Sequence, residues 1–125
     1  MIHKILVIDD TSVIRTFLKD VLSDSGFEVH TAENGQIGYE MAMKENYSII
    51  ISDIHMPIMN GLEAIRLIKK AKPEVPVLMT DSFPDKMAEM ATRAGALGCL
   101  AKPFTLDELR KTISQIMENL KVKTK

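Results

Sequence analysis

The sequence is short of three features that would point to particular classes of protein. Its single cysteine, Cys99, cannot form a disulfide within the chain, and a reducing cytoplasm is the simplest setting for it. No apolar stretch approaches the roughly 18 residues of a membrane span, and the first one, residues 5–8, stops at two aspartates, so neither a membrane partner nor a signal peptide is expected. A net charge of -1, from 16 basic and 17 acidic residues, argues against direct binding of nucleic acid.

The composition is that of one ordinary domain, and two patterns alternate along it. The chain has 125 residues, 46% hydrophobic and 26% charged, which is enough to bury a core without a staple. Short apolar runs predict buried strands at residues 5–8, 49–51, 77–79 and 99–101, and a weaker run at 28–32 predicts an edge or less buried strand. Apolar residues at helical spacing predict five helices between and after these strands, containing Val13, Phe17 and Val21; Ile37 and Met41; Leu62, Ile65 and Ile68; Met87, Met90 and Ala94; and Leu106, Leu109, Ile113, Ile116 and Leu120.

Local signals mark where several of these helices begin and end. Gly26 is a natural stop for the first helix, and Gly95 for the fourth, which is expected to open near Pro84. Thr105 and Glu108 have the spacing of a capping box at the start of the fifth helix. Five strand–helix units in this order favour an α/β fold, a doubly wound three-layer sandwich around a parallel sheet. In such a fold the ligand site lies beyond the carboxyl ends of the strands.

Chemistry-bearing residues stand at four of the five predicted strand ends. Because these ends share one edge of the sheet, four carboxylates, a hydroxyl and an ammonium group are expected to meet there, from Asp9, Asp10, Asp53, Asp81, Thr80 and Lys102. Like charges so close are unfavourable unless a cation neutralises them, and a set of carboxylates suits Mg²⁺. A carboxylate nucleophile, a metal ion and a lysine together indicate an aspartyl-phosphate site. Any one of these aspartates, such as Asp10 or Asp81, could instead be only a helix cap.

Four motifs give the chain its resemblance to a known family. They are Ile-Leu-Val-Ile-Asp-Asp at 5–10, Asp-Ile-His-Met-Pro-Ile-Met-Asn-Gly at 53–61, Val-Leu-Met-Thr at 77–80 and Leu-Ala-Lys-Pro-Phe at 100–104. From Lys4 to about Leu120 the chain resembles the receiver domains of response regulators, the CheY-like family of two-component signal transduction. The resemblance implies a flavodoxin-like (βα)5 fold with strand order 2-1-3-4-5. It also implies a receiver domain at residues 1–120, followed by a short basic tail at 121–125.

The resemblance assigns a role to each residue at the predicted site. Asp53 matches the phosphoacceptor. Asp10 would bind Mg²⁺ directly and Asp9 largely through water. The backbone carbonyl of His55 would complete the metal shell, and Mn²⁺ could replace Mg²⁺. Thr80 would move its hydroxyl to the phosphoryl group on activation. Lys102 would bind a phosphoryl oxygen and, before phosphorylation, pair with Asp53. The peptide bond before Pro103 is cis in the family.

Two residues depart from the family pattern. The position after the threonine usually holds a small residue, commonly alanine, whereas this chain has Asp81. A carboxylate there is expected to slow phosphorylation by small donors and to impede attacking water, unless Asp81 faces the surface and merely caps the next helix. Cys99 stands where the family usually has Tyr or Phe, whose ring moves inward on activation. Cysteine cannot fill that volume, so coupling through this position should be weaker or different. The thiol itself is expected to act as a small buried hydrophobe rather than a redox sensor.

The function that follows from the resemblance is a phosphorylation-controlled binding module, not an enzyme with turnover. A sensor histidine kinase or a phosphotransfer protein would donate the phosphoryl group, and the domain would catalyse only its own phosphorylation and dephosphorylation. Output would go to a downstream protein through the face of the fourth helix, fifth strand and fifth helix. A phosphorelay intermediate, or one part of a longer regulator, is an alternative within this class. A Mg²⁺-dependent phosphatase of the haloacid dehalogenase type is an alternative outside it, although such enzymes need Asp-x-Asp after the first strand. An FMN protein of flavodoxin type is disfavoured because carboxylates, not a phosphate loop, follow that strand.

Overall fold

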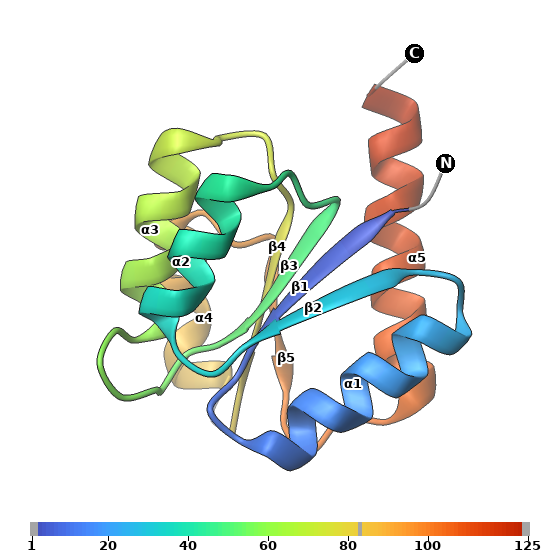
Figure 1. Cartoon of the computed structure of the whole chain (residues 1–125), viewed down its shortest axis with the longest axis horizontal. Helices are drawn as coiled ribbons and strands as arrows, with labels where there is room; N and C mark the ends of the chain where they lie inside the picture. Colours follow the sequence, from blue (N-terminus) through green and yellow to red (C-terminus); the bar gives the residue numbers. More distant parts are fainter. Residues whose placement is uncertain (1–2, 83, 124–125) are drawn as a thin grey trace.

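The chain folds as five alternating strand–helix units, seen in a computed structural model that describes residues 3–82 and 84–123 (Figure 1). The elements are β1 (Lys4–Ile8), α1 (Ser12–Asp24), β2 (Glu28–Ala32), α2 (Gly35–Lys44), β3 (Ile49–Asp53), α3 (Gly61–Ala71), β4 (Val77–Asp81), α4 (Pro84–Ala94), β5 (Gly98–Ala101) and α5 (Leu106–Lys123). The predicted (βα)5 order is therefore confirmed. Helix α5 continues to Lys123, into the segment expected to be a basic tail, and residues 124–125 of that tail lie outside the described residues.

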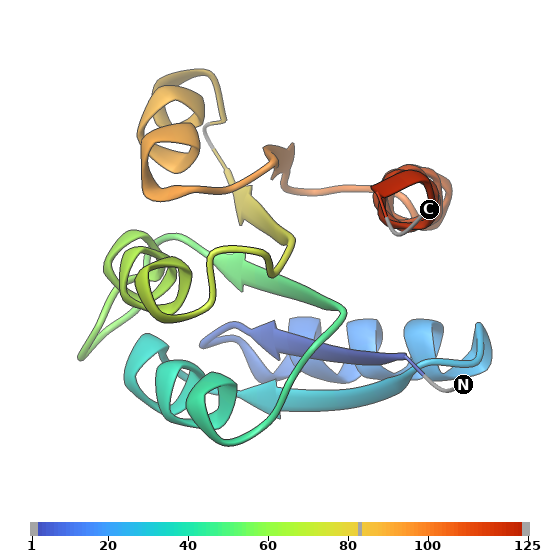
Figure 2. The same ribbon diagram turned by 90° about the horizontal axis from the view of Figure 1, so that it is seen from above.

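The strands form one parallel sheet in the order β2-β1-β3-β4-β5, which is the order predicted for a flavodoxin-like fold. The weak apolar run at residues 28–32 is indeed an edge strand, β2. Figure 2 shows the sheet between two layers of helices, with α2, α3 and α4 on one side and α1 and α5 on the other. No helix in the described part of the chain has both the length and the apolar character needed to cross a membrane.

Alternation along the central strands divides the core between the two faces of the sheet. On β1, Leu6 and Ile8 pack into the cluster under α2, α3 and α4, while Ile5 and Val7 pack into the cluster under α1 and α5. Successive side chains of a strand point to opposite faces, so a strand covered on both sides must be apolar throughout. This is why the strands read as continuous apolar runs and not as alternating ones.

Helix α1 buries one of two apolar series that have the same four-residue spacing in the sequence. Leu18 and Leu22 are buried against the sheet, with Ile14 packed beside them, whereas Val13 and Phe17 are among the exposed large hydrophobic residues. Because one helical face contains residues three and four apart, two adjacent i,i+4 series compete in this sequence. The series that begins at Ile14 faces the core, and the series that begins at Val13 is rotated toward solvent.

The predicted helix boundaries are set by the signals expected. Gly26 and Gly95 have φ values of 98° and 109°, the left-handed conformation that a glycine adopts without strain after a helix. At the start of α5, the Glu108 N–H donates to the Thr105 hydroxyl at 3.1 Å, and the Thr105 N–H donates to the Glu108 carboxylate at 3.3 Å, so the capping box is confirmed. Asn34 and Asn60 cap α2 and α3 through their side-chain oxygens.

The loop between β3 and α3 contains a strained residue. Ile58 has φ 72° and is the one non-glycine residue with positive φ among the described residues, and its side chain is 81% exposed. A β-branched side chain in the left-handed region is unfavourable because Cβ approaches the neighbouring carbonyl oxygen, at a cost of roughly 1–2 kcal/mol. Exposure means that the Ile58 side chain gains little from packing in return.

We therefore predict that Ile58→Asn stabilises the protein by about 1 kcal/mol, because asparagine tolerates the left-handed conformation. Urea unfolding of the two proteins would show a higher midpoint for the variant with an unchanged slope. Leu97→Asn is a matched control, since Leu97 is also exposed, at 61%, but does not have a positive φ. An equal gain in the control would show that removing an exposed apolar side chain, and not relieving strain, raises the midpoint.

Candidate functional site

The residues predicted at the strand ends do converge on one edge of the sheet. Asp53, the last residue of β3, is the Cα partner of Thr80 on β4. Ile51, two residues before Asp53, and Leu78, two residues before Thr80, both belong to the core cluster under α1 and α5. Because every second residue of a strand faces the same side of the sheet, Asp53 and Thr80 face that side as well. Asp53 and Thr80 therefore lie side by side on the same face, and both are almost fully buried.

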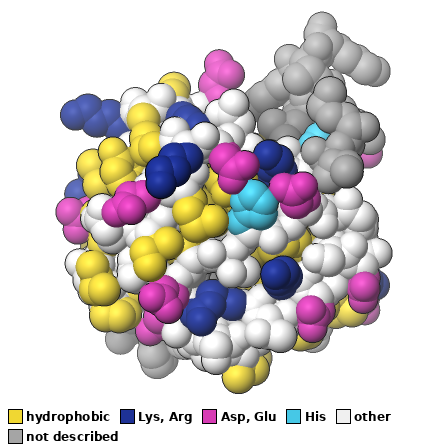
Figure 3. Space-filling model, in the orientation of Figure 1, with side chains coloured by type: hydrophobic (Ala, Val, Ile, Leu, Met, Phe, Trp, Pro, Cys, Tyr) yellow, Lys and Arg dark blue, Asp and Glu magenta, His cyan; other side chains and the backbone are white. Residues whose placement is uncertain are grey.

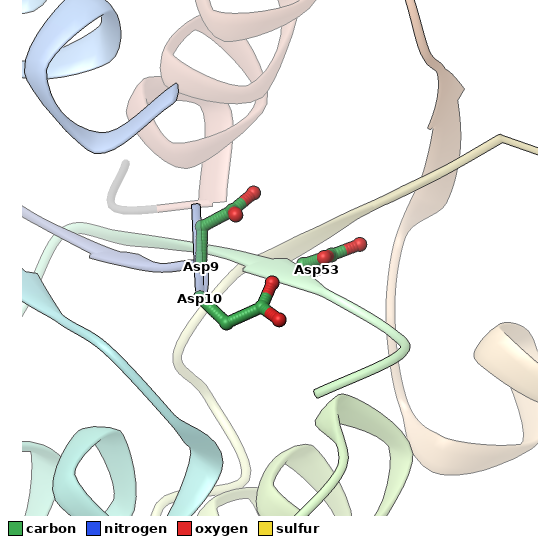
Figure 4. A group of neighbouring side chains, drawn as sticks. All are labelled: Asp9, Asp10 and Asp53. Carbon is green, nitrogen blue, oxygen red and sulfur yellow. The ribbon is translucent and has the colours of Figure 1, made fainter. Parts of the chain in front are cut away.

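Three carboxylates come together at this edge, from Asp9, Asp10 and Asp53, with one oxygen of each lying within 4.8 Å of the others. Figure 4 shows Asp9 and Asp10 on the segment that follows β1, and Asp53 at the end of β3. Asp9 and Asp53 are buried, and Asp10 is exposed. A set of oxygen ligands with one open, solvated side fits a hard divalent ion such as Mg²⁺, which keeps several waters. The predicted metal-binding side chains are thus brought together as the sequence indicated.

The ammonium group of Lys102 lies among these carboxylates. Its Nζ is 2.9 Å from Asp9 Oδ2 and 3.3 Å from Asp53 Oδ2, so the predicted contact with Asp53 is present and a shorter one to Asp9 accompanies it. The Lys102 N–H also donates to the Asp81 carbonyl at 2.9 Å, which ties the end of β5 to the end of β4. Burial alone would lower the pKa of Lys102, but its contacts with Asp9 and Asp53 together raise it. The lysine is therefore held in its charged form.

Asp53 is set in place by the start of the loop that follows it. The Ile54 N–H donates to Asp53 Oδ1 at 2.9 Å, and the Gly61 N–H donates to the Ile54 carbonyl at 2.7 Å. A Cβ at Gly61 would overlap the backbone carbonyl oxygen of Asp53, so only glycine lets α3 begin this close to the site. Burial raises the pKa of Asp53, Lys102 lowers it, Asp9 raises it, and the net direction is upward. The positive charge of Lys102 therefore does not fully offset the effects of burial and of Asp9 on the pKa of Asp53.

Asp81, the fourth predicted carboxylate, is not part of this group. It follows Thr80 directly, so alternation directs its side chain to the opposite face of β4, the face that Met79 shares with α3 and α4. The side chain is 2% exposed, so the alternative of a surface-facing Asp81 is wrong. Its Oδ1 lies 3.4 Å from Nε2 of His55, in the loop after β3.

Two features of the site were outside the reach of sequence analysis. The contact between His55 and Asp81 joins the loop after β3 to the end of β4, 26 residues further along the chain, and neither motif contains a signal for it. Asp9 has more partners than predicted: its carboxylate accepts from the Thr11 N–H at 2.8 Å, and its backbone carbonyl accepts from Arg15 Nη1 at 2.7 Å. The aspartate followed two residues later by threonine is the pattern that could have predicted the first of these bonds.

The remaining predicted features lie next to the site. The Lys102–Pro103 peptide bond is cis, as the resemblance implied. Cys99 on β5 is partly buried and packs against the core cluster under α2, α3 and α4. Burial raises the pKa of its thiol, and the charges of Asp81 and Asp53 raise it further, so the thiolate needed for redox chemistry is disfavoured. This agrees with the expectation of a small hydrophobic residue at that position.

Comparison with known proteins gives a consistent family. Residues 5–114 match the response regulator receiver domain family. The structure is similar to that of the chemotaxis response regulator CheY4 of Vibrio cholerae, with a TM-score of 0.86 and 33% identity, over 93% of this chain and 99% of that one. It is also similar to the response regulator protein TrrA of Thermotoga maritima in complex with Mg²⁺-BeF, with a TM-score of 0.85 and 32% identity, over 92% of this chain and 99% of that one.

Curated relatives are longer than this chain. It is 32% identical over 126 residues to the transcriptional regulatory protein SrrA of Staphylococcus aureus, covering 94% of this chain and 52% of SrrA. It is 30% identical over 118 residues to the regulatory protein AtoC of Escherichia coli, covering 94% of this chain and 26% of AtoC. The chain thus spans between a quarter and a half of the length of these relatives.

The raised pKa of Asp53 makes a prediction about stability and pH. A carboxyl group whose pKa is raised by folding from its ordinary value of 3.8 holds its proton more tightly in the folded protein than in the unfolded chain. Its contribution to the free energy of unfolding therefore falls as the pH rises above about 4. Without metal, we expect Asp53→Asn to gain stability relative to the original protein between pH 4 and pH 7. Urea unfolding in EDTA across this range measures the difference, and a constant difference would contradict the assigned direction.

The three grouped carboxylates, of Asp9, Asp10 and Asp53, lead to a second prediction, about metal ions. Mg²⁺ should stabilise the folded protein, by about 2.7 kcal/mol at a concentration 100 times its dissociation constant, because the unfolded chain lacks the site. Thermal unfolding with and without Mg²⁺ measures this gain. Asp10→Asn should reduce it sharply, whereas Asp24→Asn, at an exposed aspartate at the end of α1, should not. An equal gain in all three proteins would indicate non-specific binding.

Proposed function

The chain belongs to the response regulator receiver domain family, and we propose that within it Asp53 is the residue that accepts the phosphoryl group. A sensor histidine kinase or a phosphotransfer protein would be the donor. The observation that carries the proposal is the setting of the Asp53 carboxylate, which is buried, in contact with Lys102, and within reach of two further carboxylates that can share a metal ion.

The chemical step is a transfer between two nucleophiles. An oxygen of the Asp53 carboxylate attacks the phosphorus atom of a phosphohistidine, a P–O bond forms, and the P–N bond breaks. The donor imidazole leaves with the electron pair of that bond and takes up a proton. Mg²⁺ at the Asp9 and Asp10 carboxylates would neutralise charge on the phosphoryl oxygens, and Mn²⁺ is expected to substitute. Attack of water on the phosphorus atom of the aspartyl phosphate would break the P–O bond to Asp53 and release inorganic phosphate, so that the domain would also catalyse its own dephosphorylation.

Lys102 and Thr80 support the transfer from within the protein. Lys102 is already charged and directed at Asp53, so its ammonium group can bind a phosphoryl oxygen without moving far. Thr80 lies beside Asp53 across the β3–β4 pair and offers a small hydroxyl donor that rotates freely. On this proposal the backbone carbonyl of His55 completes the metal shell, as the loop after β3 would place it.

The output of the domain is proposed to be a protein contact on the face formed by α4, β5 and α5. Met90 on α4 and Leu97 just before β5 are large hydrophobic residues that remain 50% and 61% exposed, as expected of a surface that binds another protein. The side of the molecule drawn in Figure 3 carries Lys and Arg interspersed with Asp and Glu. That side has β2 and α2 in front and lies away from the proposed output face. The net charge of -1 supports an output by protein contact and not by direct binding of nucleic acid.

Two settings fit this chemistry. The chain can act alone or as a phosphorelay intermediate, or it can be the receiver part of a longer regulator. The second setting is supported by SrrA, of which the match covers 52%, and by AtoC, of which it covers 26%. In each setting the reaction at Asp53 is the same.

The central prediction is that incubation with acetyl phosphate, or with a phosphorylated sensor kinase, and Mg²⁺ adds one phosphoryl group to the protein. Intact mass measures the addition, which should be lost completely in Asp53→Ala and on removing Mg²⁺ with EDTA. Asp20→Ala is a control, at an exposed aspartate on α1. An addition that survives Asp53→Ala, or none with either donor, would reject the proposal. Turnover of a phosphomonoester would instead favour the haloacid dehalogenase type of phosphatase.

A further inference from the structure

The contact between His55 and Asp81 joins the loop after β3 to the end of β4, beside the proposed phosphorylation site. His55 Nε2 lies 3.4 Å from Asp81 Oδ1, yet the two side chains differ greatly in exposure, at 68% for His55 and 2% for Asp81. The imidazole ring therefore lies on the solvent side of a carboxylate that is otherwise covered by protein.

The backbone around Asp81 keeps this carboxylate close to the site. The Ile54 N–H donates to the Thr80 carbonyl at 3.2 Å, and the Lys102 N–H donates to the Asp81 carbonyl at 2.9 Å. The end of β4 is thus held from both sides, by β3 and by β5. Asp81 follows Thr80, the Cα partner of Asp53, so its charge lies one residue beyond the proposed phosphoacceptor pair.

The electrostatic balance of the site makes an additional negative charge significant. Among the described residues, three carboxylates, from Asp9, Asp10 and Asp53, are grouped with the ammonium of Lys102, whose contacts are with Asp9 and Asp53. A phosphodonor is itself an anion. Burial raises the pKa of Cys99, and Asp81 and Asp53 both add to the rise through their charges, so the fields of these two carboxylates reach the same place on β5. Buried charges are screened much less than exposed ones.

We propose that His55 is a positioning residue for the phosphoryl donor, because its imidazole engages Asp81 and so limits the repulsion between that carboxylate and an anionic donor approaching Asp53. The inference rests on the proposed function of Asp53. Asp81 alone slows phosphorylation by small donors, and His55 reduces this effect. The two side chains thus set the rate as a pair, and the effect of His55 depends on the presence of Asp81.

A purely structural role for His55 makes a different prediction. A side chain that is 68% exposed gains little stability from one contact at the surface. The ring can therefore be removed without unfolding the protein, and its backbone carbonyl remains. If the ring only shielded Asp53 from solution by its bulk, removing it would speed phosphorylation, and it would do so whether or not Asp81 is present.

The test is a double-mutant cycle on the rate at which acetyl phosphate and Mg²⁺ phosphorylate Asp53, followed by intact mass. We expect His55→Ala to slow the reaction about two- to fivefold, the size typical of a single partly exposed contact. The change should be in the half-saturating donor concentration and not in the maximal rate. Asp81→Asn should speed the reaction. In the double variant, the His55 substitution should have no further effect. His55→Gln, which keeps an N–H donor, should recover part of the rate.

Two controls keep the test independent of folding. His3→Ala removes an imidazole next to β1, where it contacts Ser48, and should leave the rate unchanged. If Asp81→Asn fails to fold, the ionic strength replaces it, because the loss caused by His55→Ala should shrink between about 0.1 M and 1 M salt, as the screening length falls from about 10 Å to 3 Å. Urea midpoints of all variants report on stability separately.

The outcomes are distinct. An unchanged or increased rate in His55→Ala, or an equal loss with and without Asp81, would overturn the role of His55 and leave phosphorylation of Asp53 intact. A failure of the original protein to be phosphorylated, by acetyl phosphate or by a kinase, would overturn the proposed function and this inference with it.

Discussion

The placement of one ammonium group among buried carboxylates is the interaction on which the rest of the site depends. Lys102 reaches Asp9 at 2.9 Å and Asp53 at 3.3 Å, so one cation offsets acidic groups that follow two different strands. Without it, two nearly buried carboxylates would face each other with little solvent to separate their charges. The pKa of Asp53 is nevertheless raised, chiefly by burial. The folded protein therefore retains a surplus of negative charge at this site. Binding of a divalent cation, or of a proton by one of the carboxylates, would neutralise that surplus.

Parallel pairing is what makes this concentration of charge possible. All carboxyl ends of a parallel sheet lie on one edge, and alternation then assigns each residue there to one of two faces. Asp53 and Thr80 fall on the face of α1 and α5, and Asp81, one residue further along β4, falls on the face of α3 and α4. Neighbouring residues of one strand, such as Thr80 and Asp81, thus lie on opposite faces of the sheet. A single register shift would exchange them, so the apolar pattern that fixes the register also fixes which carboxylates can share an ion.

The sequence is sufficient for the fold and for most of the site because both depend on pattern. Strand runs, helix spacings and the capping box at Thr105 each act locally, and the strand ends converge for topological reasons. The features that the sequence did not predict are those for which two arrangements fit the local pattern equally well. Two i,i+4 series compete on α1, and the side chains of Ile14 and Val13 differ in exposure only because the helix settles with one series inward. The expectation that Asp81 would join the other three carboxylates was wrong for a related reason, since a strand-end residue faces one side of the sheet or the other according to a register that the motif alone does not state.

The two departures from the family pattern are linked by the structure, and together they bear on how a phosphoryl group at Asp53 would be sensed. The family places at position 99 an aromatic ring that transmits activation by moving its volume, and a cysteine lacks that volume. In its place, Cys99 faces the same side of the sheet as Asp81, and its thiol experiences the charges of both Asp81 and Asp53. A charge added at Asp53 would therefore act on the end of β4 through its field, at the point where Asp81 is held by His55. Asp81 is the last residue of β4 and pairs with Ala101 on β5, so a change of field at this carboxylate would be felt at the edge of the proposed output face.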